Sequence, residues 1–235
     1  MNQPQVIFLD AVGTLFGVQG SVGQVYSDQA AQFGVEAEPE GLQAAFLQSF
    51  RAARPAAFPG VAAADLPQAE FRWWQDVSRE TFAQAGLLAQ FDNFEDYFES
   101  LYAYFATAGP WEVYPDVRPA LEAWQQQGIP LGIISNFDSR LFQVLDALGL
   151  ADYFQGVVLS TQAGMAKPDP AIFHLALSRF QVVAAHAWHI GDSYREDVEG
   201  ACAAGLKGIY LDRSGQATAG AIPSLAALLA DSSNA

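Results

Sequence analysis

The sequence predicts an α/β fold: a doubly wound, parallel, Rossmann-like sheet core with an inserted all-helical cap domain. Five short, continuously apolar runs occur at residues 6–9, 131–134, 157–159, 188–190 and 209–211. Such runs are typical of strands that are buried on both faces of a parallel sheet. From residue 113 onward the runs alternate with helical segments. More than one hundred residues separate the first run from the second, and that interval lacks strand-like runs.

The long interval after the first run is rich in Ala, Gln and Phe. We expect four helices in it, over residues 21–33, 38–53, 66–85 and 93–106, separated by Pro- and Gly-bearing turns such as 55–60 and 109–110. The expected division is a helical cap at residues 18–110 and an α/β core made of residues 1–17 and 111–235. A chain of 235 residues suits one core that carries an inserted subdomain.

The segments between the later runs have helical patterns. Val117, Leu121 and Trp124 share one helical face before Gly128, and Leu141, Val144, Leu145 and Leu148 do so before Gly149. A glycine just after the last apolar position is a typical helix end. Alternating strands and helices imply right-handed crossovers, and therefore a doubly wound sheet.

Composition and charge restrict the classes of partner. The net charge is −15, and Lys167 and Lys207 are the only lysines. Binding to a phosphate backbone needs clustered cations, so a nucleic acid is not expected as a partner. The same negative field repels small anions, and an anionic substrate would therefore need cations close to its site.

The chain carries few signals for a particular compartment. Its one cysteine, Cys202, excludes an internal disulfide and fits a reducing compartment, although it equally fits a small core residue. The N-terminus has no basic segment before its short apolar stretch, and no apolar window is long enough for a membrane span. We therefore expect a soluble, cytoplasmic protein without a membrane partner, and the sequence indicates no oligomeric state.

Polar residues follow the first four predicted strands. Asp10, Ser135, Lys167 and Asp192 stand after these runs or in the loops they lead into. In open parallel sheets the ligand crevice lies outside the carboxyl ends of the strands, so these residues should converge. Asp10 follows V-I-F-L and precedes A-V-G-T-L. Its carboxylate is a candidate nucleophile, and from this segment alone a turn cap is an equally good interpretation.

Two further segments offer groups to an anion. Ser135 and Asn136 could provide a hydroxyl and a backbone N–H, although Ser-Asn is also ordinary turn chemistry. Lys167 precedes Pro168-Asp169-Pro170, a rigid stop before the next helix. A lysine there can be a solvated side chain, but its place beside the expected crevice favours a functional role.

A second acidic segment is H-I-G-D-S-Y-R-E-D, residues 189–197. Asp192 closes a predicted strand, and Asp197 begins the next helix. With Asp10 they would form a carboxylate cluster, and oxygen-only ligands favour Mg²⁺. The alternative for Asp197 is a first-turn helix acid, which the helix dipole favours.

Taken in order, D-A-V-G-T-L, S-N, K-P and G-D-x-x-x-x-D resemble the four motifs of the haloacid dehalogenase superfamily. The helical interval between the first two motifs resembles the helical-cap class, subfamily I, of that superfamily. More narrowly, G-S-V-G-Q-V-Y, F-R-W-W-Q-D and S-N-F-D-S-R-L resemble the branch of haloacid dehalogenase-like hydrolase domain-containing protein 3. This similarity spans most of the chain.

The resemblance implies a phosphatase-like hydrolase acting on a small phosphorylated, anionic molecule. Asp10 would attack phosphorus and form an aspartyl-phosphate, while Thr14 and Ser135, beside Asn136, would hold the phosphoryl oxygens. Lys167 would neutralise charge in the transition state.

The resemblance also implies a bound Mg²⁺ as cofactor. Its ligands would be Asp10, the backbone carbonyl of Val12 and Asp192, with Asp197 as a supporting or direct acid. The ion would let two anions, nucleophile and phosphate, approach each other.

The sequence departs from the family pattern at Val12. Phosphatases of the superfamily typically have a second aspartate there, which protonates the leaving group; valine transfers no proton. General acid–base catalysis contributes about 10²–10⁴-fold, so ordinary alkyl phosphates should be poor substrates.

Three interpretations follow from this departure. The first is a Mg²⁺-dependent phosphohydrolase that is slow or prefers leaving groups needing little protonation. The second is a metal-free 2-haloacid dehalogenase, against which Asp192 counts. The third is a binding or regulatory protein with little turnover. A phosphonate hydrolase would need a cap lysine, and residues 18–110 contain none.

Overall fold

Five parallel strands form the central sheet. The computed structural model describes residues 3–216 and 220–230, and it orders the strands β5-β4-β1-β6-β7. They are β1 (Val6–Leu9), β4 (Leu131–Ser135), β5 (Gly156–Leu159), β6 (Ala187–Gly191) and β7 (Lys207–Tyr210). Each predicted apolar run coincides with a strand or overlaps it. The last run reaches one residue too far, because Leu211 lies beyond β7 in an isolated bridge to Ile222.

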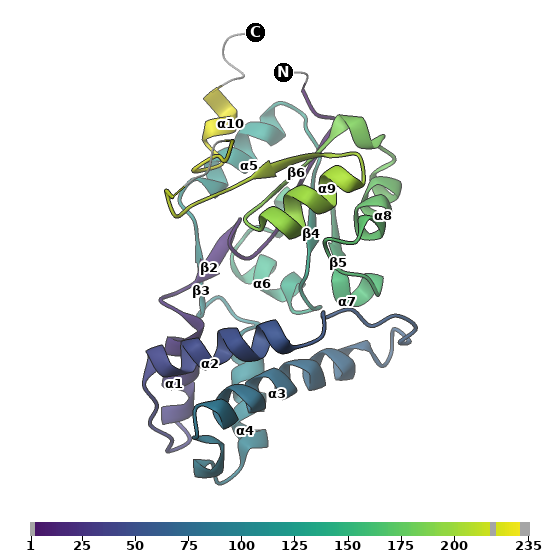
Figure 1. The fold of residues 1–235 in the computed structure, drawn as a ribbon. Helices are drawn as coiled ribbons and strands as arrows, with labels where there is room; N and C mark the ends of the chain where they lie inside the picture. The colour runs from purple at the N-terminus through teal and green to yellow at the C-terminus, as the bar shows by residue number, and fades with distance from the viewer. Residues whose placement is uncertain (1–2, 217–219, 231–235) are drawn as a thin grey trace.

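Helices cover both faces of this sheet (Figure 1). On β1, Ile7 and Leu9 pack against α5 (Val117–Gln126) and α6 (Leu141–Ala147). Val6 and Phe8 point the other way, against α8 (Pro170–Phe180) and α9 (Gly200–Ala203). Because successive side chains of a strand alternate between faces, a sheet covered twice needs an unbroken apolar run. The predicted α/β fold class is confirmed.

Short elements complete the core. They are η2 (Ala151–Tyr153), α7 (Ser160–Ala163), η3 (Ala184–His186), the π-helix η4 (Tyr194–Glu199) and α10 (Ala227–Ala230). Local capping explains where two helices begin. Asp169 accepts a hydrogen bond from Ala171 N at 2.9 Å before α8, and Ser193 accepts one from Glu196 N at 3.3 Å before η4.

Four helices from the long interval gather at one end of the sheet (Figure 1), and we refer to them as the helical cap. They are α1 (Val22–Ala31), α2 (Pro39–Ala52), α3 (Leu66–Gln84) and α4 (Phe94–Tyr104), with a turn of 3₁₀ helix, η1 (Leu88–Gln90). Ser21 and Asn93 cap α1 and α4 from outside, so these helices start one residue later than predicted. The cap has its own core, which is rich in aromatic side chains, around Tyr26, Phe82 and Tyr97. Within the described ranges, no helix combines the length and apolar character that a membrane crossing requires.

A two-stranded ribbon joins the core to the cap (Figure 1). β2 (Phe16–Val18) and β3 (Trp111–Val113) pair antiparallel, with Val18 opposite Trp111. The sequence pattern did not predict this pair, because strands of three residues, one with a central glycine, carry no periodic signal. Both connections between core and cap run through this ribbon.

Candidate active site

The candidate residues meet where the order of strands reverses. Asp10 follows β1 directly, and its backbone N–H donates to Ile190 O at 2.9 Å. Ser135 ends β4 and Asp192 follows β6, and these strands are the two neighbours of β1. A ligand crevice is expected at such a switch point.

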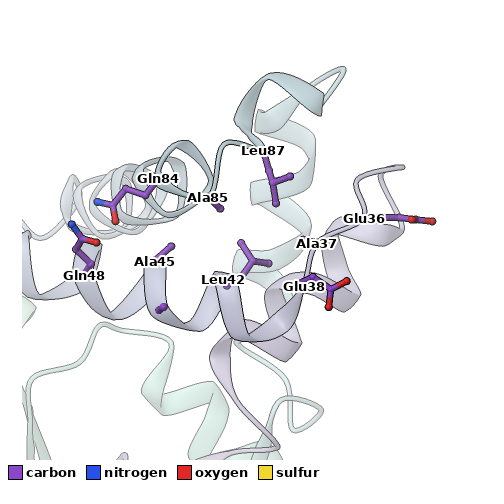
Figure 2. A pocket seen from close by; sticks show the side chains of 11 residues that line it. Glu36, Ala37, Glu38, Leu42, Ala45, Gln48, Gln84, Ala85 and Leu87 are labelled. Atoms are coloured by element: carbon purple, nitrogen blue, oxygen red, sulfur yellow. The ribbon is translucent and has the colours of Figure 1, made fainter.

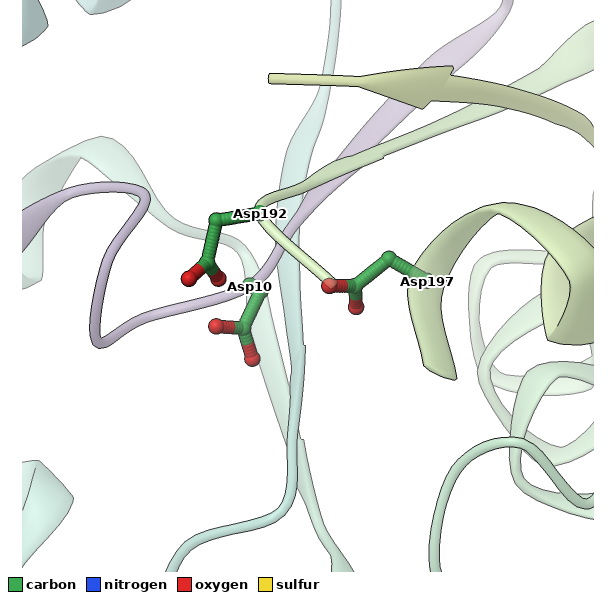
Figure 3. Close-up of side chains that lie close together, drawn as sticks. All are labelled: Asp10, Asp192 and Asp197. Carbon is green, nitrogen blue, oxygen red and sulfur yellow. The ribbon is translucent and has the colours of Figure 1, made fainter. Parts of the chain in front are cut away.

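Three carboxylates from two loops and the π-helix face one another there (Figure 3). One oxygen each of Asp10, Asp192 and Asp197 lies within 4.8 Å of the others. Two glycines make room for them. Gly13 has φ +88°, and a Cβ on it would overlap the Asp192 carboxylate; a Cβ on Gly191 would overlap Asp197. The cluster therefore depends on backbone positions that only glycine fills.

Lys167 lies between two of these acids. Its Nζ donates to Oδ1 of Asp10 and to Oδ1 of Asp197, both at 2.6 Å, and its side chain is 2% exposed. Burial alone would lower the pKa of Lys167, but the two carboxylates outweigh this effect and raise it. The lysine is therefore held as an ammonium beside the candidate nucleophile.

Asn136 positions this lysine. Its Oδ1 accepts from Lys167 N at 2.8 Å, and its Nδ2 donates to Lys167 O at 3.0 Å and to Glu196 Oε2 at 3.1 Å. The amide is therefore occupied by protein partners. Ser135 and Thr14 are buried, and the Thr14 hydroxyl has no hydrogen-bond partner among the residues the structure describes.

Asp197 is an anchoring residue. Its Oδ1 accepts from Lys167 and contacts His189 Nε2 at 2.9 Å, and its Oδ2 accepts from Ser193 N at 2.9 Å. Burial opposes ionisation, yet Lys167 and His189 hold the pKa of Asp197 well below its usual range. Burial lowers the pKa of His189, which is fully enclosed. Because His189 is enclosed behind Asp197, it is not placed to protonate the leaving group in place of an acid at position 12.

The charges of the cluster do not balance. Three carboxylates stand against one ammonium, which leaves two negative charges when all are ionised. Burial raises the pKa of Asp10, although Lys167 opposes the shift. The pKa of Asp192 rises to about 7, through desolvation first and then through the charges of Asp10 and Asp197. A divalent cation among these oxygens would remove the repulsion, and the donor set suits a hard cation.

A buried contact between cap and core was not predicted from the sequence. Glu70 of α3 is 2% exposed, and its Oε1 accepts from Ser139 N, Ser139 Oγ and Thr161 Oγ1 at 3.1, 2.9 and 2.5 Å. Ser139 belongs to the loop that follows Ser135. Glu70 precedes the F-R-W-W-Q-D segment directly, which is the signal that could have drawn attention to it.

A second missed contact lies in the same loop. Arg140 Nε and Nη2 donate to the two oxygens of Asp138 at 2.8 and 2.7 Å, and both side chains are buried. The pair reaches into the cap, where Trp74 Nε1 donates to Asp138 Oδ2 at 2.6 Å and Arg140 Nη1 donates to Tyr102 O at 3.2 Å. Both residues stand in the S-N-F-D-S-R-L segment.

A separate hollow lies within the cap (Figure 2). It has a volume of about 540 Å³, and α2, the end of α3 and the segments next to them line it. Its lining residues include Leu42, Gln48 and Leu87, but none of the candidate site residues. The acidic cluster is therefore distinct from this hollow.

Comparison with known proteins places the chain in a family. The model of the haloacid dehalogenase-like hydrolases matches residues 4–205. Haloacid dehalogenase-like hydrolase domain-containing protein 3 of Bos taurus is 35% identical over 204 residues, covering 87% of this chain and 80% of that protein. Phosphoserine phosphatase of Thermus thermophilus is 33% identical over 112 residues, 47% of this chain and 45% of that protein.

A solved structure shows the same fold. L-2-haloacid dehalogenase from Xanthobacter autotrophicus superposes with a TM-score of 0.73 at 18% identity, over 99% of each chain. The resemblance that the four motifs indicated is confirmed by the family match and by the relative from Bos taurus. The chain belongs to the haloacid dehalogenase-like hydrolases.

Proposed function

We propose that this hydrolase is a Mg²⁺-dependent phosphohydrolase for a small phosphorylated molecule, with Asp10 as its covalent nucleophile. The observation that carries the proposal is the cluster of Asp10, Asp192 and Asp197, in which Lys167 binds Asp10 and Asp197. Similarity to a phosphoserine phosphatase over about half of the chain supports a phosphate ester as substrate.

The residues present fit a divalent cation. The cluster offers only oxygen donors and carries excess negative charge, and the missing side chain of Gly13 lets the Asp192 carboxylate lie against the loop that holds the Val12 carbonyl. Asp10, Asp192 and the carbonyl of Val12 would hold Mg²⁺, and Asp197 would support them through Lys167. When bound, Mg²⁺ supplies positive charge that lets a phosphate dianion approach a carboxylate.

The protein's own groups provide the nucleophile and the charge. A carboxylate oxygen of Asp10 forms a bond to phosphorus, and the bond from phosphorus to the leaving oxygen breaks. Water then attacks the phosphorus of the aspartyl-phosphate, which releases phosphate and restores the Asp10 carboxylate. Lys167 holds positive charge beside Asp10 throughout, and Thr14 and Ser135 donate to phosphoryl oxygens.

Val12 limits this reaction, because the leaving oxygen must take a proton from elsewhere. A missing general acid costs about 10²–10⁴-fold. We therefore expect slow hydrolysis of alkyl phosphates and faster hydrolysis of aryl phosphates, whose leaving groups depart as anions.

The test is hydrolysis of p-nitrophenyl phosphate with Mg²⁺ and with a chelator. Activity should require Mg²⁺, Asp10→Asn should abolish it, and Val12→Asp should increase it. Asp92→Asn, an exposed acid in the cap, is the matched control and should leave the rate unchanged. Retained activity in Asp10→Asn would refute the covalent proposal. An unchanged rate in Val12→Asp would refute the account of the missing proton.

One observation favours a second candidate, a metal-free 2-haloacid dehalogenase. Val12 suits it, because a halide leaves without a proton. Asp192 counts against it, since an uncompensated carboxylate repels an anionic haloacid. Chloride release from a 2-chloro acid in the presence of a chelator would establish this activity, and its absence would remove the candidate.

A further inference from the structure

Arg213 connects the C-terminal part of the core to the loop after the candidate nucleophile. It follows β7 and lies outside residues 4–205, which the family model matches. Its side chain is 18% exposed. Nε donates to Gly13 O at 3.2 Å, Nη2 to Thr14 O at 2.7 Å, and Nη1 to Asp116 Oδ1 at 2.8 Å.

These partners flank both strands of the ribbon that carries the cap, on the side of the core. Gly13 and Thr14 precede β2, and Asp116 follows β3. One guanidinium therefore holds both strands at their core ends. Its planar set of donors suits three acceptors at once, whereas the ammonium of a lysine is a single point charge.

Neighbouring groups fix the guanidinium in this place. Its Cζ lies 4.1 Å from the ring centroid of Tyr114, which follows β3. The Tyr114 hydroxyl fills the space beside Gly17 of β2, where a Cβ would overlap it. Asp116, which pairs with Arg213, also accepts from Leu225 N at 2.6 Å through its other oxygen. The contacts form one assembly between the ribbon and the C-terminal part of the core.

The loop held by Arg213 is part of the candidate site. Gly13 lies so close to Asp192 that a side chain would overlap it, and Val12 stands between Gly13 and Asp10. We propose that Arg213 is a positioning residue, which fixes this loop against Asp192 and holds the base of the ribbon. The part of the proposal that concerns turnover rests on the proposed phosphohydrolase activity.

Hydrogen–deuterium exchange tests the positioning role without any substrate. Arg213→Met should speed amide exchange in residues 11–18 at least tenfold, and Arg213→Lys should have an intermediate effect. Arg118→Met is the matched control, because Arg118 also donates to two backbone carbonyls, those of Leu148 and Gly149, on the core. It should leave residues 11–18 unchanged. Unchanged exchange in Arg213→Met, or equal acceleration in Arg118→Met, would overturn the proposal.

Kinetics on p-nitrophenyl phosphate provide the second readout. Arg213→Met should lower kcat at least tenfold with a smaller change in KM, and Arg213→Lys should recover part of the loss. If the wild-type protein hydrolyses no phosphate ester, the proposed function fails, and exchange still decides the positioning role. If Arg213→Met does not fold, Arg213→Lys decides: faster exchange in residues 11–18 supports the proposal, and wild-type exchange and kcat overturn it.

Discussion

Replacement of Glu70 by alanine tests how strongly the cap is attached to the core. The Glu70 carboxylate accepts three hydrogen bonds, two from Ser139 and one from Thr161. Thr161 Oγ1 keeps a second acceptor, Phe137 O at 3.3 Å, whereas the Ser139 hydroxyl accepts its second contact, from Gln162 Nε2 at 3.3 Å, and its O–H is left without an acceptor. The backbone N–H of Ser139 loses its acceptor entirely.

The expected loss follows from these contacts. Three hydrogen bonds of about 1 kcal/mol each are removed, and alanine returns a few tenths of a kcal/mol through its higher helix propensity. Glu70→Ala should therefore lower the free energy of unfolding by about 2–3 kcal/mol at pH 5. Urea unfolding, followed by circular dichroism, measures this difference.

The contribution of Glu70 to the free energy of unfolding should change with pH in a definite direction. Burial, its largest cause, raises the pKa of Glu70 above 4.5 in the folded protein. The folded state then binds more protons than the unfolded state as the pH rises from 4.5 to the raised pKa. The contribution of Glu70 to the free energy of unfolding therefore falls across that window. The difference between wild type and Glu70→Ala should shrink between pH 5 and pH 8.

Glu80→Ala is the control for Glu70, because Glu80 lies on the same helix but is exposed. Surface changes of this kind stay within about 0.5 kcal/mol. A loss in Glu70→Ala no larger than in Glu80→Ala would refute the attachment. A difference that grows with pH would show that the ionised form of Glu70 is the stabilising one, against the burial argument.

Three further predictions concern the site and its surroundings. Gly34→Ala is the reference for backbone strain, because Gly34 has φ +77° and open space around it. It should lower the free energy of unfolding by about 1–2 kcal/mol. Gly13→Ala should lower the free energy of unfolding, measured with urea, by more than this, because its Cβ also meets Asp192. Equal losses in the two variants would contradict the overlap. Asp138→Ala should lower the free energy of unfolding by about 3–5 kcal/mol, because it leaves the buried Arg140 without its carboxylate partner. A loss below about 1 kcal/mol would argue against a buried ion pair. Mg²⁺ at about one hundred times its dissociation constant should add about 2.7 kcal/mol to the free energy of unfolding; an equal gain in Asp192→Asn would remove that acid from the metal site.

The sheet could be predicted because burial on both faces requires each strand to be a continuous apolar run. Val6 to Leu9 is apolar throughout, since each face of β1 has its own helical layer. The ribbon could not be predicted in this way. Phe16 to Val18 has one buried side chain and a central glycine, and its partner strand begins more than ninety residues later.

The candidate site likewise has a part that the sequence predicts and a part that it does not. The convergence of Asp10 and Asp192 follows from a rule about parallel strands, and the structure places them together. Contacts between distant loops obey no such rule. Glu70 meets Ser139 across 69 residues, and Arg213 meets Gly13 across 200. Single charged residues of this kind look like solvated surface groups until their partners are placed.

The pairing of Val18 with Trp111 brings together the two points at which the chain enters and leaves the cap. The chain enters the cap after Val18 and returns to the core at Trp111, so the cap adds no strand to the five-stranded sheet. Insertions are tolerated best where their two ends lie close together. A different module joined at these two residues would keep the five-stranded sheet, but it would have to supply new partners for Ser139, Thr161 and Asp138, whose present partners in the cap lie on α3.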